Sequence, residues 1–384
     1  MSGSPSEAAT GAPAEGSGLR GRFAVFREKY HLAIEVAFFF AGFLFDVLLL
    51  HRIDSLPLLI HQGTYLVLTA ALVFVDFQLH ARGKEPEGFW GKVASYRLWV
   101  MHFFLGTLLN AFIVFYFRSS SGVMATIFLV ALVALIVLNE LPRFRERGPV
   151  VRVALLSFCI TSYLAYLIPV VWGVLRSWQY YLSLALGAAC TVGLWKIFIR
   201  FGHDPTWTFR RAVVPGLALQ AFLFLAYLGD AIPPVPLSLK SIAMYNEVIP
   251  ERDGPERHYR LRYVAPPAWK VWASVPNDLL LAPGEKAWVF VRIFAPARFQ
   301  DSVAFAWDFD DSKQGWIPWG KPFSTRLSGG SEKGYRTYAY TSPSRAGTYR
   351  VRVLTADERE IGRKTFRVDF STEETERVLA EEVD

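Results

Sequence analysis

The sequence predicts an all-α membrane bundle of seven transmembrane helices followed by an all-β, immunoglobulin-like sandwich domain. Three observations lead to this prediction. The first 237 residues contain seven long apolar stretches, each near the ~20 residues that cross a bilayer core. Lys and Arg alternate between the segments that connect these stretches. After the last stretch the chain becomes polar, aromatic and alternating, with turn residues at short intervals, which is typical of strands.

Composition divides the chain in the same place. Of the 384 residues, 52% are hydrophobic and only 20% are charged, and the net charge is +7. Residues 1–237 contain 19 Lys and Arg against 13 Asp and Glu, whereas residues 238–384 contain 22 against 21. The positive charge therefore belongs to the membrane loops, and no nucleic-acid partner is expected, because that would need basic residues gathered on a folded face.

The apolar stretches follow an N-terminal segment, residues 1–30, that is expected to be disordered and cytoplasmic because residues 1–18 consist almost wholly of Ser, Gly, Ala, Pro and Glu. The two cysteines, Cys159 and Cys190, lie inside apolar stretches, so neither a disulfide framework nor a thiolate metal site is expected. The seven predicted spans are residues 31–50, 57–80, 98–117, 122–141, 151–173, 178–199 and 211–230.

Positive charge in the connecting segments predicts the orientation. From the N-terminal flank to the sixth loop, the Lys and Arg counts are four, one, four, one, four, one and four. Positively charged loops stay in the cytoplasm. The N-terminus is therefore expected inside and residues 238–384 outside. Within the sixth span, Ala185, Ala189 and Gly193 have the four-residue spacing that allows close helix approach.

Polar residues near the outer ends of the spans form a candidate membrane site. They are Asp46, Arg52, Asp54, His61 and Asp230. Intramembrane ionisable groups are functional candidates by default; structural pairing is the favoured interpretation here, with a substrate or metal site as the alternatives. No catalytic residue, cofactor or metal is assigned, because the chain lacks a phosphate-binding glycine loop, a His-Glu-x-x-His run and a lysine in the last span.

The outer half is expected to begin after a Pro-rich linker, residues 231–237, and to occupy residues 238–371, followed by a mobile acidic tail at 372–384 that has a helical pattern. The absence of a Cys…Trp…Cys pattern excludes a true immunoglobulin domain. The predicted strands are residues 239–248, 258–264, 269–275, 286–294, 302–308, 322–327, 335–341, 347–354 and 362–370.

Two features of this half suggest a binding surface. Trp316 and Trp319 lie in a loop-like run, where aromatic side chains either stack on a sugar or anchor a protein, or close one end of the sandwich. Asp308, Asp310 and Asp311 precede that run. Three carboxylates suit Ca²⁺, but the ligand pattern is incomplete, which favours a solvated acidic turn.

Three stretches of the outer half, residues 334–338, 347–353 and 361–368, resemble the C-terminal module known as domain of unknown function 2914 (DUF2914) of bacterial proteins. That family pairs a Gly-x-Trp/Tyr-Arg-Val strand with a Gly-x-x-x-Phe-x-Val strand, and Tyr349 stands where Trp is common. The resemblance covers residues 303–368. Residues 42–46 and 52–55 are similar to the membrane half of multi-pass members. The resemblance implies an architecture and no chemistry. Because the family is bacterial, it also implies that the protein lies in the inner membrane and that its outer half, residues 238–384, is periplasmic.

Two functions remain open from the sequence. In the first, the protein is held in the lipid bilayer and its outer domain binds an envelope protein or glycan, in sensing, scaffolding or assembly. In the second, the bundle is a transporter or intramembrane enzyme that uses the polar site at the outer helix ends.

Overall fold

The computed structural model describes residues 55–82, 88–140, 149–251, 258–265, 278–328, 334–371 and 379–384. All of these belong to one compact unit, Leu50–Asp384. The first predicted span and the predicted strand at 269–275 lie outside the described residues, as do Asp46, Arg52 and Asp54 of the candidate membrane site.

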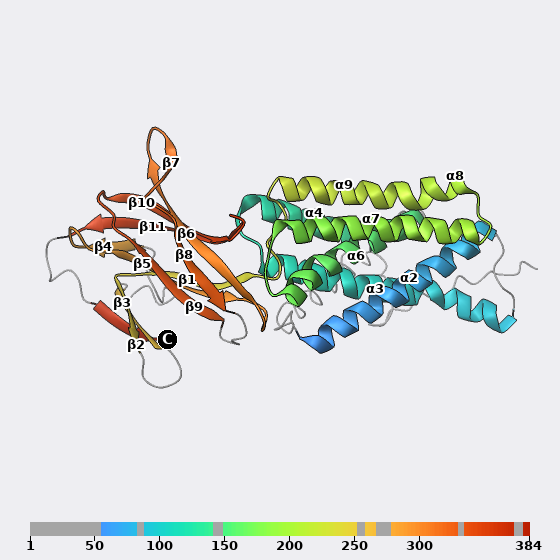
Figure 1. Ribbon diagram of the computed structural model, residues 1–384, viewed down its shortest axis with the longest axis horizontal. Coiled ribbons are helices and arrows are strands. Elements are labelled where there is room, and N and C mark those ends of the chain that lie inside the picture. The colour runs from blue at the N-terminus through green and yellow to red at the C-terminus, as the bar shows by residue number, and fades with distance from the viewer. Residues whose placement is uncertain are drawn as a thin grey trace, which may run out of the picture. The chain divides into compact units, whose positions relative to one another are not determined.

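Helices make up the first part of the described chain, and strands make up the second (Figure 1). The helices are α2 (Leu56–Arg82), α3 (Gly88–Arg118), α4 (Gly122–Glu140), α6 (Pro149–Trp172), α7 (Ser177–Arg200), α8 (Pro205–Thr208), the π-helical turn η1 (Phe209–Val213) and α9 (Val214–Leu228). The predicted change of character from apolar helix to strand is confirmed.

Four of the seven predicted membrane helices have counterparts of crossing length among the described residues. Within the described residues, four segments are long and apolar enough to cross a bilayer: Leu56–Leu79, Val150–Trp172, Ser177–Arg200 and Pro205–Leu228. The third and fourth predicted spans coincide with α3 and α4. Among the described side chains of these two helices, the apolar segments are Phe103–Arg118 and Gly122–Ala134.

Small and polar side chains mark the faces where α6, α7 and α9 meet. Gly187 lies so close to α9 that an added Cβ would be 2.8 Å from Gln220 Nε2. The same Nε2 donates to Ser157 Oγ at 2.8 Å and to Thr161 Oγ1 at 2.6 Å. These four residues come from three helices. Hydrogen bonds between buried amide and hydroxyl groups therefore join the helices, in addition to apolar packing.

The strands form three sheets. They are β1 (Ser238–Tyr245), β2 (Glu247–Glu251), β3 (His258–Val264), β4 (Asp278–Leu281), β5 (Ala287–Phe294), β6 (Gln300–Asp311), β7 (Gly315–Pro318), β8 (Phe323–Ser328), β9 (Tyr335–Thr341), β10 (Gly347–Thr355), β11 (Glu360–Phe370) and β12 (Leu379–Val383). The sheet orders are β1-β5-β9, β4-β11-β10-β6-β7 with β8 also paired to β6, and β12-β3-β2. The β4–β11 pair is parallel and every other pair is antiparallel.

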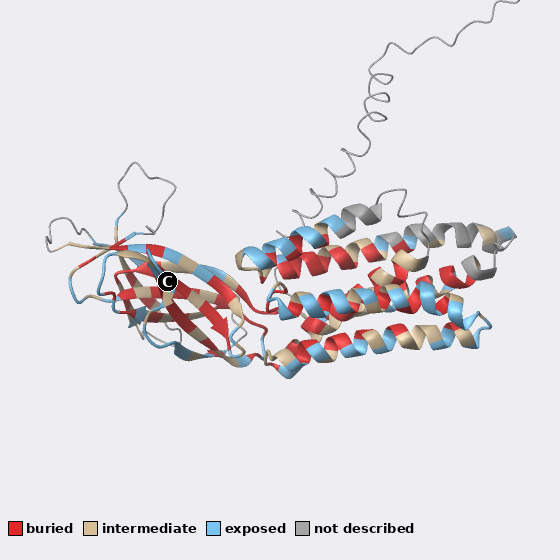
Figure 2. Ribbon diagram, turned by 90° about the horizontal axis from the view of Figure 1, so that it is seen from above, coloured by how far each residue is buried: buried red, intermediate tan, exposed pale blue. Residues whose placement is uncertain are grey.

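The six-stranded sheet and the β1-β5-β9 sheet share one apolar core. Alternate residues of β5 and β10 point into it, among them Val289, Val291, Val351 and Val353, which are each wholly buried. From Thr348 to Val353 of β10, buried residues alternate with partly exposed ones, and Figure 2 shows buried residues beside partly exposed ones in the β-rich part. This alternation is the period of two expected for a strand with one face in the core. The sequence of residues 348–353 predicts the same alternation, with Tyr349, Val351 and Val353 facing a core and the two arginines facing water. The burial of β10 confirms it.

The third sheet covers the outer face of β5. Phe290, on the side of β5 opposite to Val289, packs with Tyr245, Tyr259 and Leu261 in a second apolar cluster. The prediction for the chain's end was wrong here: part of the acidic tail forms β12, which pairs with β3. Glu381 and Arg262 form an ion pair across this ladder at 2.7 Å. Strand pairing with β3 thus outweighs the helical pattern of the isolated sequence.

Asp301 of β6 and Asp357 of the turn between β10 and β11 hold the N-terminal end of α7. Arg176 Nη1 donates to both carboxylate oxygens of Asp301, at 2.8 and 2.7 Å, and the backbone N–H of Leu175 donates to the same carboxylate at 3.0 Å. The backbone N–H of Ser177 donates to the Asp357 carboxylate. Carboxylates stabilise this end of a helix, where backbone N–H groups lack partners.

Candidate functional site

An arginine-rich surface lies on the solvent side of β10 and β6. Because Val351 and Val353 point into the core, the alternation of β10 places Arg350 and Arg352 on the opposite side. The register pairs Arg350 with Asp308 of β6. The strand alternation in the sequence was enough to place both arginines facing water, but the partner on β6 required the register.

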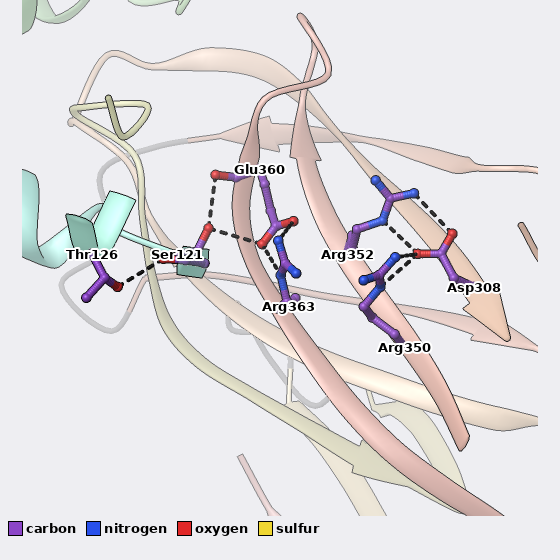
Figure 3. Close-up of polar contacts among 8 residues, drawn as sticks. Ser121, Thr126, Asp308, Arg350, Arg352, Glu360 and Arg363 are labelled. Atoms are coloured by element: carbon purple, nitrogen blue, oxygen red, sulfur yellow. Dashed lines mark hydrogen bonds and ion pairs between the residues drawn. The ribbon is translucent and has the colours of Figure 1, made fainter. Parts of the chain in front are cut away.

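Asp308 is bound by both arginines. Its Oδ2 accepts from Arg350 Nε at 2.9 Å and from Arg352 Nε at 2.8 Å, and its Oδ1 accepts from Arg352 Nη2 at 3.1 Å. Figure 3 shows the two guanidinium groups approaching this one carboxylate. Asp308 is 3% exposed. Two cations share one anion, so the cluster keeps one net positive charge close to solvent.

Trp316 lies over this cluster. It belongs to β7, which pairs with the end of β6 in a hairpin that projects from the sheet (Figure 1). The guanidinium carbon of Arg350 lies 4.3 Å from the centroid of the Trp316 ring. The Trp316 ring stays 38% exposed. We call Trp316, Arg350, Arg352 and Asp308 the arginine–tryptophan platform.

Trp319 has a different role from Trp316. Its ring centroid lies 5.5 Å from that of Tyr349 and 5.8 Å from that of Phe309. Its backbone N–H donates to the carbonyl of Trp307 at 2.7 Å. Trp319 therefore closes one end of the shared core, as one of the two interpretations of this run required. Of the predicted pair, Trp316 is exposed and Trp319 is partly buried against the core.

The acidic run before the hairpin does not gather into one site. Asp308 binds the two arginines, whereas the Asp311 carboxylate accepts from the backbone N–H groups of Lys313 at 2.9 Å and Gln314 at 3.1 Å. These hydrogen bonds lower the pKa of Asp311 below its usual value. Among the described residues, no group of three or more His, Cys, Asp and Glu side chains has the arrangement that a metal ion needs.

The two described members of the candidate membrane site have different neighbours. The His61 ring is exposed and packs on Tyr65, with ring centroids 4.1 Å apart. Asp230 is also exposed, and its carboxylate lies 3.8 Å from Arg359 Nη2. Asp46, Arg52 and Asp54, the other members, fall outside the described residues.

A buried ion cluster between α2, α3 and α6 was not predicted as a unit. Asp76 pairs with Arg97 at 3.1 Å and with Arg152, and all three side chains are nearly buried. Asp76 and the two arginines are each visible in the sequence as charges at span ends. What the sequence lacks is the helix packing that brings them together. The cluster fixes three helices to one another.

The platform has the chemistry of an anion-binding surface with an aromatic face. A guanidinium group donates to carboxylate or phosphate oxygens through two parallel hydrogen bonds. Asp308 occupies part of each arginine's donor set and thereby orients the remaining N–H groups. The exposed indole of Trp316 adds a flat apolar surface beside that positive charge. A ligand with both an anionic group and a flat apolar face matches this combination.

Comparisons with known proteins assign no family. No family model matches the chain, and no curated protein matches it. Among solved structures, the chain is similar to an alkylpurine DNA glycosylase, AlkC, of Pseudomonas fluorescens bound to DNA containing an abasic site analog. That similarity has a TM-score of 0.21 and 13% identity, and it covers 72% of this chain and 71% of the other.

Proposed function

We propose that the chain is a multi-pass inner-membrane protein whose β-rich region is an extracytoplasmic, immunoglobulin-like sandwich that binds an anionic glycan of the cell envelope. The single observation that supports the ligand class is the exposed Trp316 ring stacked on Arg350. Sugar rings offer an apolar face to an indole, and acidic sugars or phosphate substituents offer oxygens to the two arginines. The alternating counts of Lys and Arg support the orientation.

A matched pair of variants tests the ligand class. The opposite sheet has its own exposed cation–aromatic pair, Lys286 over Tyr340 at 4.0 Å. In full-length protein purified in detergent, Trp316→Ala and Arg350→Gln should each weaken binding to polygalacturonate by about tenfold, or ~1.4 kcal/mol. Tyr340→Ala should leave this binding unchanged. Binding should also weaken as salt is added, because the arginines are partly exposed to solvent.

Two results would contradict the ligand class. Equal binding of the charged polysaccharide and of uncharged dextran would remove the role of the arginines. Equal losses in the Trp316 and Tyr340 variants would show that any exposed cation–aromatic pair suffices. If crosslinking in native membranes captures a protein through residue 316 while polygalacturonate does not bind, the ligand is a protein and the glycan proposal is wrong.

A separate labelling experiment tests the orientation. The β-strand region has no native cysteine, and Ser324 on β8 is exposed. A Ser324→Cys variant should react with a membrane-impermeant maleimide once the outer membrane is permeabilised, without lysis of the inner membrane. Labelling only after full lysis would place the β-rich region in the cytoplasm and overturn the orientation.

A further inference from the structure

A cavity lies where the first turn of α4 meets β11 and the segment after α9. Its volume is about 360 Å³, inside the range of about 300–1,000 Å³ typical of small-molecule sites. Gly122 and Val123 at the start of α4 line one side, and Pro233 and Pro234 line another. We call this cavity the junction pocket. It is separate from Trp316, although Arg352 of the platform also lines it.

Charges of both signs line the junction pocket in equal number. The cations are Arg352, Arg359 and Arg363, and the anions are Asp230, Glu358 and Glu360. A pocket for a simple anion would have an excess of positive charge. Equal numbers of guanidinium and carboxylate groups instead match a head group that has one anionic and one cationic end.

Contacts within the structure fix the arginine side of this pocket. Arg363 Nε and Nη2 donate to the two carboxylate oxygens of Glu360 at 2.6 and 2.8 Å, and Ser121 Oγ donates to the same carboxylate at 3.2 Å (Figure 3). Arg363 Nη2 also lies against Gly122, where an added Cβ would be 3.1 Å away. The guanidinium group is therefore held beside the first turn of α4, whose backbone N–H groups favour anions.

Arg359 supplies a second fixed cation. Its Nη2 donates to the carbonyl of Ile232 at 2.6 Å, and its guanidinium carbon lies 3.9 Å from the centroid of the Tyr227 ring. Its Nε is buried and has no hydrogen-bond partner among the described residues. A buried donor of this kind costs stability unless a ligand or water accepts from it.

An apolar strip leads away from the pocket along α4. Val123, Ile127 and Val130 are each more than half exposed, and their spacing of four and three residues puts them on one face of the helix. Val123 also lines the junction pocket. The charged cavity and the apolar strip are therefore continuous, which is the arrangement that an amphiphile requires.

From this combination we infer that the junction pocket binds one phospholipid whose head group carries both a phosphate and a primary amine. The phosphate lies against Arg359, Arg363 and the first turn of α4, and the ammonium group lies against Asp230 and Glu358. The acyl chains follow the exposed face of α4. The inference rests on the proposed membrane location, in which the start of α4 is at the outer surface of the bilayer.

The test uses full-length protein reconstituted in nanodiscs of phosphatidylglycerol with a minor fraction of phosphatidylethanolamine, then extracted and washed in detergent. Phosphatidylethanolamine retained per protein, measured by mass spectrometry, should exceed its share of the nanodisc. Arg363→Ala should reduce this retention about tenfold. Arg367→Ala is the matched control, because Arg367 lies on the same strand, is exposed and pairs with Asp369 outside the pocket, and it should retain the lipid.

Each other result overturns a defined part of the inference. Equal retention by the two variants removes the pocket as the site. Preferential retention of phosphatidylglycerol makes the site an anion site. In parallel nanodiscs where phosphatidylcholine replaces phosphatidylethanolamine as the minor lipid, equal retention removes recognition of the amine. Carbonate extraction of native membranes distinguishes failure of this inference from failure of the proposed function. A chain that carbonate releases is not embedded in the membrane, and then both the inference and the proposed function fail. A chain that stays embedded without enrichment overturns the inference alone.

Discussion

Arg350 contacts two partners at once: its guanidinium carbon lies 4.3 Å from the centroid of the Trp316 ring, and its Nε donates to Asp308 at 2.9 Å. The carboxylate holds the guanidinium plane, and the guanidinium group in turn supports the exposed indole. Strand register sets this order, because β6 lies between β10 and β7. Changing the buried acid should therefore change the behaviour of the exposed aromatic residue.

Replacing Asp308 tests this dependence. Asp308→Asn removes the shared anion and leaves two arginines beside a neutral amide, so we expect a loss of about 1–3 kcal/mol in the free energy of unfolding. The arginines are partly exposed and regain water, which keeps the loss below that of a fully buried pair. The measurement is the melting temperature in detergent, followed by Trp fluorescence. Asp310→Asn, an exposed change on the same strand, should melt like the wild type. Equal melting of the two variants would show that Asp308 does not organise the platform.

The turn that presents Trp316 should depend on pH through Asp311. Its pKa is lowered by hydrogen bonds from the backbone N–H groups of Lys313 and Gln314. A carboxyl group with a lower pKa in the folded state adds stability above its unfolded pKa, near 3.9, and this stability is lost as pH falls through the folded value. The protection of the Gln314 amide, which is its exchange rate compared with the intrinsic rate at the same pH, should therefore fall in acid. In Asp311→Asn this protection should be low throughout and show no such step. A wild-type profile without an acid step would contradict the role of Asp311.

Asp301 should control how firmly the start of α7 is held against the strands. Its carboxylate accepts from Arg176 and from the backbone of Leu175, and its side chain is 2% exposed. Asp301→Asn keeps one acceptor but removes the charge. Hydrogen exchange should accelerate by about tenfold, or ~1.4 kcal/mol of local opening, at the first turn of α7. Exchange in β10, within the shared core, should not change. Uniform acceleration throughout the chain would indicate general destabilisation instead.

Strands were predictable where one face is buried and the other is wet. The predicted range 258–264 coincides with β3, and 335–341 coincides with β9. Short strands that depend on a distant partner, β4 and β12, were missed because their own sequences lack alternation. The arginine–tryptophan platform was predictable only in part. Alternation predicted that the arginines of β10 face outward, whereas the carboxylate that they share, Asp308, is placed by the register with β6.

Helix faces were harder to predict, because an apolar helix gives little sign of which side is inside. In α7, Ala185 and Ala189 are exposed, and the space around Gly193 is open. The described helices therefore make no close approach along these three residues. The buried face follows a different four-residue series, Gln179, Ser183, Gly187 and Thr191. Polar and small residues at helical spacing were the available signal, and it points to the side where α7 meets α6 and α9.

The two glycines of α7 provide a matched test of that assignment. An added methyl group at Gly187 would collide with Thr161 of α6 and Gln220 of α9, so Gly187→Ala should cost about 1–3 kcal/mol through overpacking. A methyl group at Gly193 would meet nothing within 4 Å, and Gly193→Ala should raise stability by up to ~1 kcal/mol, because alanine favours the helix. Melting temperatures in detergent should therefore move in opposite directions. If Gly193→Ala were the more damaging change, the inner face of α7 would be the predicted alanine stripe after all, and the hydrogen bonds of Gln220 would not lie at the centre of the bundle.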